Sequence, residues 1–254
     1  MRYFIHLSYK GTAYNGWQSQ PEGQGKGVQQ VVERGLSTIL RTTVEIVGAG
    51  RTDTGVHARN MYAHIDLEKE IVKEDNIIGR LNSILPKDIA ILDIFPVKDT
   101  AHARFDATLR EYVYHIHTFK DPFIESSSYL FFHSLNIEAM NRACDIMMRY
   151  TDFQCFSKVK TDVKTFICHI SHARWEDTGD GHLKFTIRAD RFLRNMVRAI
   201  VGTMIDIGRG NILPEDIASI IESHSRCKSG MSAPAHGLTL NKVEYDWDNI
   251  LIKK

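Results

Sequence analysis

Residues 43–67 read TVEIVGAGRTDTGVHARNMYAHIDL, a pattern that predicts a strand, a glycine-rich loop and a second strand. The first strand is expected from Thr43 to Val47. In the second, apolar residues alternate with polar ones, at Met61, Ala63, Ile65 and Leu67. The loop between the strands spans residues 48–55.

The segments on either side complete a β-α-β-β-α-β order. Two stretches have apolar residues at helical spacing, one over residues 28–40 and one over residues 77–85, which Pro86 ends. Alternating strand patterns at residues 3–9 and 89–97 lie outside these helices. The first half of the chain therefore predicts one complete motif of two helices and four strands.

The second half repeats the motif. Strands are expected around residues 112–116, at Thr165 to Trp175, at Leu183 to Ala189 and at Leu238 to Tyr245. Helices are expected around residues 137–147, from Leu193 to Met204, and after Pro214. We therefore predict an α+β fold of two tandem ferredoxin-like halves, residues 1–105 and 106–254. The halves join into one mostly antiparallel sheet, with helices on one side and a central cleft.

Composition sets few limits on function. The chain has 254 residues, 43% of them hydrophobic, and a formal net charge of +1. No apolar run approaches the roughly 20 residues that span a bilayer, and the N-terminus begins directly with a strand pattern. We therefore expect no membrane association and a cytoplasmic location.

Cysteines and histidines raise the question of a metal site. Cys155, Cys168, His169 and His172 are all types of residue that bind zinc, but no Cys-x-x-Cys pair is present. The predicted strand points Cys168 and His169 to opposite faces of the sheet. We therefore predict structural cysteines and no bound metal.

Positive charge is concentrated in two segments. Residues 188–198 hold Arg188, Arg191, Arg194 and Arg198 against one acid, Asp190, and residues 158–164 hold Lys158, Lys160 and Lys164 against Asp162. Arg191, Arg194 and Arg198 are spaced i, i+3 and i+7, on one side of the predicted helix. Charge alone favours RNA contact and a solvated basic face about equally.

The glycine loop holds the strongest candidate for chemistry. It fails the dinucleotide fingerprint, because the third glycine, Gly55, comes five residues after Gly50 and a strand follows. Asp53 lies on this loop, with Arg51 two residues before it. A carboxylate beside an arginine stays ionised, which suits a nucleophile or a base. The same spacing also fits an aspartate that only caps the turn.

The loop Gly48-Ala49-Gly50-Arg51-Thr52-Asp53-Thr54-Gly55-Val56-His57-Ala58 closely resembles the signature of the tRNA pseudouridine synthase A family. Further similar motifs follow the family's order from residue 7 to about residue 245. They are Gly16-Trp17-Gln18, Leu81-Asn82 with Leu85-Pro86, His102-Ala103-Arg104-Phe105, Arg110-x-Tyr112-x-Tyr114, Phe192-Leu193-Arg194-Asn195-Met196-Val197-Arg198 and Pro234-Ala235-x-Gly237-Leu238.

The resemblance implies specific roles. Asp53 becomes the catalytic nucleophile, and Arg51 contacts RNA and helps to displace the target base. Tyr112 packs on the flipped uracil and accepts the proton that leaves its carbon, directly or through water. Arg198 pairs with Asp53. Leu238 lines the pocket, while Arg191 and Arg194 contact the substrate.

The resemblance also implies the partners. The family is homodimeric, binds tRNA across both subunits in an RNA-binding cleft, and needs neither metal nor organic cofactor. Its targets are uridines at positions 38, 39 and 40 of the anticodon stem-loop. Lys10, Asn60 and Met61 depart from the usual family pattern, and we expect them near the RNA path.

Two other functions fit the residues less well. A non-catalytic tRNA-binding or chaperone protein of the same fold needs no aspartate near phosphates, so the joint presence of Asp53, Tyr112 and Arg198 argues against it. A phosphate-loop nucleotide enzyme needs a lysine and magnesium-ligand motif that the chain lacks.

Overall fold

The strands and helices form two units in the computed structural model, which describes residues 1–21, 23, 25–72, 75–158 and 164–252. The first unit comprises Met1–Thr108 and Leu240–Lys254, and the second comprises Leu109–Thr239. The predicted halves placed the C-terminal segment with residues 106–254, whereas here it belongs to the first unit. The reason is hydrogen bonding: Lys98 donates to the carbonyls of Asn249 and Ile250, and the Tyr245 hydroxyl donates to Ala103.

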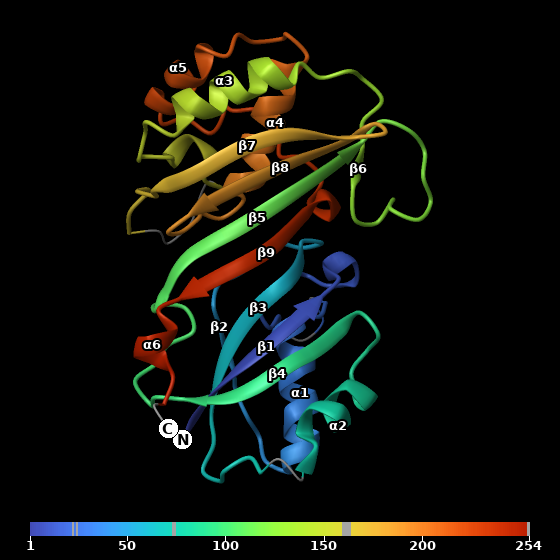
Figure 1. Cartoon of the computed structure of the whole chain (residues 1–254), viewed down its shortest axis with the longest axis vertical. Coiled ribbons are helices and arrows are strands. Elements are labelled where there is room, and N and C mark those ends of the chain that lie inside the picture. Colours follow the sequence, from blue (N-terminus) through green and yellow to red (C-terminus); the bar gives the residue numbers. More distant parts are fainter. Residues whose placement is uncertain (22, 24, 73–74, 159–163, 253–254) are drawn as a thin grey trace. The chain divides into compact units, whose positions relative to one another are not determined.

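The first unit is an antiparallel sheet with two main helices. Its elements are β1 (Arg2–Tyr9), α1 (Val28–Leu40), β2 (Val47–Gly48), β3 (His57–Asp66), α2 (Ile77–Ile84), β4 (Ile89–Val97), β9 (Leu238–Tyr245) from Leu240 onward, and the short α6 (Trp247–Ile250). The strand order is β4-β1-β3-β9, and β2 pairs with β3. Figure 1 shows β4, β1 and β3 side by side, and both of their pairings are antiparallel.

Alternating apolar residues make one face of this sheet the core. Met61, Ala63 and Ile65 of β3 are at most 1% exposed. The helices cover them with a buried stripe, formed by Val28, Val32 and Leu36 of α1 and by Ile77 and Leu81 of α2. Burial of each such side chain stabilises the unit by about 1.5–3 kcal/mol.

The strand predicted from Thr43 to Val47 is wrong in extent, because β2 contains only Val47 and Gly48. The preceding residues bond to α1 instead of to a neighbouring strand. The amide of Val44 donates to the Ser37 hydroxyl, and the amide of Ile46 donates to the Glu33 carboxylate. Side chains of the helix thus take the donors that a longer ladder would use.

The second unit has the strand order β5-β8-β7. Its elements are β5 (Ala107–His117), β6 (Tyr129–Leu130), α3 (Ile137–Met147), β7 (Ile170–Gly179), β8 (His182–Ala189), α4 (Met196–Gly208) and α5 (Asp216–Glu222). The Asn136 side chain caps α3 by accepting from the Ala139 amide. Trp175 stacks on Phe185 in the core, with ring centroids 4.8 Å apart.

Several predicted boundaries in this unit are wrong, among them the starts of a strand and of a helix. The strand expected from Thr165 begins at Ile170. The helix expected from Leu193 begins at Met196, because Asn195 before it has φ +66°, outside the helical region. Helix α3 and strand β9 have the predicted bounds. Among the residues described here, no helix is both long and apolar enough to cross a bilayer.

Candidate active site

The loop after β2 alternates between buried anchors and accessible side chains. Thr52 and Val56 are buried, at 8% and 1% exposure. Between them, Asp53 is half-buried and Thr54 is exposed, and Arg51 before them is exposed as well. The loop therefore presents the Asp53 carboxylate and the Arg51 guanidinium toward the surface, while the buried residues Thr52 and Val56 anchor it.

A β-turn shapes the loop at the aspartate. The amide of Val56 donates to the carbonyl of Asp53 at 3.1 Å. Gly55, at the third position of this turn, has φ +81°, a conformation that residues with a side chain rarely adopt. Asp53 is thus the first residue of a tight turn whose shape depends on a glycine.

The segment 9–17 clamps this turn. The carbonyl of Thr52 accepts a hydrogen bond from the amide of Trp17 at 3.3 Å, and the amide of Gly55 donates to the carbonyl of Tyr14 at 3.2 Å. A side chain on Gly16 would lie 2.3 Å from the carbonyl oxygen of Thr52, so only glycine permits this approach. Sequence reasoning identified Gly16-Trp17 only as a motif and missed its contact with the loop.

His57 holds the far end of the loop. Its Nδ1 accepts a hydrogen bond from the amide of Gly11 at 2.8 Å, and the side chain is 5% exposed. His57 is thus a hydrogen-bonding residue, and it is the first residue of β3. Because Nδ1 accepts, the neutral ring carries its proton on Nε2.

In the second unit, Tyr112 is half-buried on β5. Its ring meets the ring of Phe192 edge-on, with centroids 5.3 Å apart and an interplanar angle of 86°. Tyr114 is fully buried and donates from its hydroxyl to the carbonyl of Pro234 at 2.9 Å. Tyr114 therefore packs in the core, whereas part of Tyr112 is accessible.

Arg198 is half-buried near the start of α4. Its Nε donates to the carbonyl of Ala233 at 2.7 Å. Leu238, the first residue of β9, is 4% exposed. The structure thus places Arg198 and Leu238 on ordered elements.

The prediction that Arg191, Arg194 and Arg198 share one helix face is wrong. Arg191 and Arg194 precede α4, in the irregular segment between β8 and the helix. Asp190 shapes the start of that segment, since its carboxylate accepts from the amides of His169 and Arg191. Arg194 remains exposed. Lys160 and Asp162 of the other basic segment lie outside the described residues.

Three cysteines are packed in the core. Cys144, Cys155 and Cys168 are buried and Cys227 is exposed, all without a disulfide. Burial raises the pKa of the Cys155 and Cys168 thiols to about 12. His169 pairs with Asp190 at 2.8 Å. Within the ranges that the structure describes, no group of three metal-binding side chains is placed to hold an ion.

Comparison with known proteins identifies the family. The sequence model of the family described as tRNA pseudouridine synthase matches residues 6–106 and 150–246 of this chain. The chain belongs to this family. The tRNA pseudouridine synthase A of Parabacteroides distasonis is 52% identical over 244 residues, 96% of each chain. That of Bacteroides thetaiotaomicron is 51% identical over 249 residues, 97% of this chain and 91% of the relative.

A more distant relative agrees. The tRNA pseudouridine synthase A of Bacillus subtilis is 38% identical over 251 residues, 97% of this chain and all of the relative. The chain is therefore an isomerase that converts uridine to pseudouridine in tRNA.

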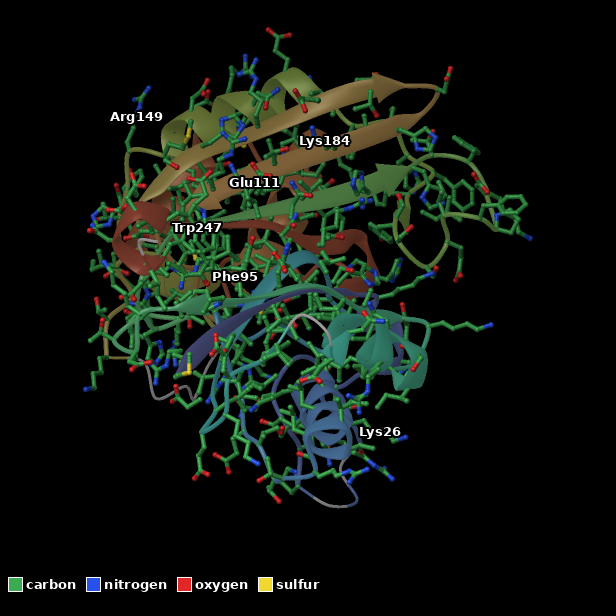
Figure 2. The ribbon with its side chains drawn as sticks, turned by 60° about the horizontal axis from the view of Figure 1, so that its bottom comes forward. Lys26, Phe95, Glu111, Arg149, Lys184 and Trp247 are labelled. Atoms are coloured by element: carbon green, nitrogen blue, oxygen red, sulfur yellow. The ribbon has the colours of Figure 1, made fainter. Side chains whose placement is uncertain are left out.

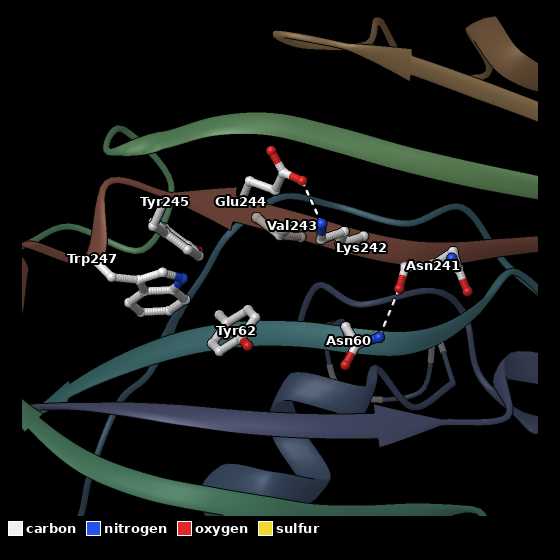
Figure 3. A pocket seen from close by; sticks show the side chains of 8 residues that line it. All are labelled: Asn60, Tyr62, Asn241, Lys242, Val243, Glu244, Tyr245 and Trp247. Carbon is white, nitrogen blue, oxygen red and sulfur yellow. Dashed lines mark hydrogen bonds and ion pairs between the residues drawn. The ribbon is translucent and has the colours of Figure 1, made fainter. Parts of the chain in front are cut away.

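The pseudouridine synthase also has a shallow pocket of about 460 Å³ on β3, β9 and α6 of the first unit (Figure 3). Some of its lining residues pair with one another: Lys242 pairs with Glu244, and the Asn60 amide donates to the carbonyl of Asn241. Figure 2 labels Phe95 and Trp247, whose ring centroids lie 5.9 Å apart beside it. Neither Asp53 nor Arg51 lines this pocket.

Of the positions that depart from the usual family pattern, Met61 is buried in the first unit. Its side chain is 0% exposed, and its expected place near the RNA path stays a prediction. Asn60 is half-buried and binds His6 Nε2 as well as Asn241. Lys10 is exposed.

Proposed function

We propose that the enzyme isomerises uridines at one or more of positions 38, 39 and 40 of the tRNA anticodon stem-loop, with Asp53 as the nucleophile. One observation carries the role of Asp53. Its carboxylate stands half-buried on a turn whose neighbours Thr52 and Val56 are buried anchors. A nucleophile held in place in this way loses little entropy when it meets the target.

The reaction needs no electron donor or acceptor. The bond between ribose C1′ and uracil N1 breaks, the base turns, and C1′ rejoins the base at C5. The proton leaves C5, and N1 gains one. Asp53 enters by attacking either the ribose or the uracil ring, and the bond that its carboxylate forms to the substrate breaks again before pseudouridine is released. Extrusion of the target base costs a few kcal/mol, which RNA contacts must offset.

The other site residues follow from the family resemblance and from local geometry. The exposed Arg51 would contact RNA beside the target base. The accessible part of Tyr112 would stack on the uracil and accept the C5 proton, directly or through water. Arg198 would hold the Asp53 carboxylate, and Leu238 would line the uracil pocket. Arg191 and Arg194 would bind phosphates.

We propose further that both units are ferredoxin-like. In the first unit, the strand order β4-β1-β3 with β2 on β3, together with the chain order β-α-β-β-α-β, supports this assignment. From the resemblance, we also propose a cytoplasmic homodimer that needs no cofactor.

The test is to map pseudouridine in tRNA after deletion of the gene, and again after restoring either the wild-type gene or Asp53→Asn. We expect the modification at positions 38–40 to disappear, to return with the wild type and to stay absent with Asp53→Asn. The purified variant should still bind tRNA, because the change is isosteric and removes only the charge. If Asp53→Asn restores the modification, the catalytic role is wrong. If deletion leaves all pseudouridine in place, the chain is the non-catalytic binding protein.

A further inference from the structure

The turn that carries Asp53 has a side-chain anchor from the strand beneath it. The hydroxyl of Tyr9, the last residue of β1, lies 2.8 Å from the Thr52 hydroxyl in a buried hydrogen bond. Tyr9 is 4% exposed and Thr52 is 8% exposed. Thr52 is the residue immediately before Asp53, so this bond acts one peptide unit away from the carboxylate.

Further contacts of segment 9–17 with the turn and with His57 after it use backbone atoms of that segment. They are the amides of Gly11 and Trp17, the carbonyl of Tyr14, and the close approach at Gly16. Tyr9 differs from them because a side-chain substitution removes its bond and leaves the backbone unchanged. Its ring is also held in place, since it packs at 6.1 Å from the ring of Trp17.

We infer that Tyr9 and Thr52 are positioning residues for catalysis, and that their hydroxyl pair holds the Asp53 carboxylate in register with the target uridine. The inference rests on the proposed role of Asp53. A displacement of about 1 Å at a reacting group can slow a reaction by about 100-fold. A buried bond next to the nucleophile therefore affects the rate of the chemical step more than it affects RNA binding, because neither hydroxyl is accessible to RNA.

The chain offers a matched control on the same strand. Tyr3 of β1 is 3% exposed, and its hydroxyl accepts from the amide of Ile71 at 3.0 Å. Tyr3→Phe therefore also deletes a hydrogen-bonded hydroxyl from a buried tyrosine of β1, but far along the strand from the Asp53 turn. Both tyrosine variants should lower thermal stability by similar amounts.

The experiment measures single-turnover pseudouridine formation, by release of tritium from C5-labelled tRNA, together with the Kd for tRNA. We expect Tyr9→Phe to slow the chemical step by about 10- to 100-fold and to change Kd by less than about twofold. Tyr3→Phe should keep the wild-type rate. A wild-type rate in Tyr9→Phe, or an equal loss in Tyr3→Phe, overturns the inference.

Thr52 provides a second test that does not depend on the folding of the tyrosine variants. Thr52→Val keeps the shape and loses the hydroxyl, whereas Thr52→Ser keeps the hydroxyl. We expect the valine variant to be as slow as Tyr9→Phe, the serine variant to be close to wild type, and Tyr9→Phe with Thr52→Val to be no slower than either alone. Equal rates for serine and valine, or additive losses in the double variant, refute the hydroxyl pair.

Asp53→Asn is assayed in parallel. Activity in that variant refutes the proposed nucleophile itself. An inactive Asp53→Asn together with a full-rate Tyr9→Phe refutes only the positioning role. Hydrogen exchange at the amides of Gly55 and Val56 provides a structural readout: exchange should be faster in Tyr9→Phe and Thr52→Val and unchanged in Tyr3→Phe.

Discussion

Arg198 and Ala233 exchange two hydrogen bonds. Arg198 Nε donates to the Ala233 carbonyl at 2.7 Å, and the Ala233 amide donates to the Arg198 carbonyl at 2.9 Å. The segment before β9 is thereby tied to the first turn of α4. The guanidinium is held through Nε, and its two terminal nitrogens carry the remaining donors of the planar fork.

This relationship predicts that lysine cannot replace Arg198. Arg198→Lys keeps the charge but removes both the Nε donor and the planar fork, so kcat/KM should fall by about tenfold or more. Arg209→Lys, an exposed position that follows the same helix, is the matched control and should behave as wild type. Steady-state kinetics on tRNA checks both. Full activity of Arg198→Lys would show that the enzyme does not use the planar geometry of the Arg198 guanidinium.

Salt dependence should locate the RNA contacts of the irregular segment before α4. Removing one phosphate contact lowers the slope of log K against log salt by about 0.7–0.9. Arg191→Ala with Arg194→Ala should therefore flatten the slope measured by filter binding. The paired control is Arg34→Ala with Arg149→Ala, which removes two other exposed arginines. An unchanged slope in the first pair would place the RNA elsewhere.

Two substitutions at Tyr112 separate its ring from its hydroxyl. Tyr112→Phe keeps the edge-on packing against Phe192, so it should bind tRNA normally but turn over slowly, because the C5 proton then has no acceptor. Tyr112→Ala should weaken binding as well, since stacking on a base contributes about 1–3 kcal/mol. Affinity and single-turnover rate decide the matter. Near-normal turnover in Tyr112→Phe would show that another group or a water molecule accepts the C5 proton.

His64 should make stability depend on pH. Burial lowers the pKa of His64 to about 4, and the neighbouring Arg2 and His102 add to the effect. The unfolded imidazole therefore binds a proton that the folded one does not. The contribution of His64 to the free energy of unfolding is fully present above pH 6.5. It is lost as the pH falls from 6.5 to 4, which lowers the free energy of unfolding by up to about 3 kcal/mol.

Chemical denaturation of His64→Asn tests this dependence. The asparagine oxygen can still accept from the amide of Ala103, which His64 Nδ1 accepts at 3.1 Å. The slope between pH 6.5 and pH 4 should become shallower in this variant. It should persist in His133→Asn, which removes an exposed loop histidine. An unchanged slope in His64→Asn would assign the dependence to other groups.

The amino-acid sequence alone determined the element order and the family. The alternation in β9 and the helical spacing in α3 predicted both elements with the observed bounds. These patterns are local, because a strand or helix repeats every two or 3.6 residues, and burial of one face is enough to impose the repeat. The glycine loop was found in the same way, since its residue types mark a turn wherever they occur.

Tertiary contacts decided where some elements begin and end and which distant residues meet, because local sequence patterns do not contain this information. Residues 43–46 have strand character, yet Ser37 and Glu33 of α1 take their amide donors, and β2 is reduced to two residues. Arg191 and Arg194 have helical spacing, yet Asp190 and the left-handed Asn195 keep them out of α4. The bond between Tyr9 and Thr52 joins residues 43 positions apart, and no sequence period connects them. Such contacts depend on which side chains the folded backbone brings within hydrogen-bonding distance.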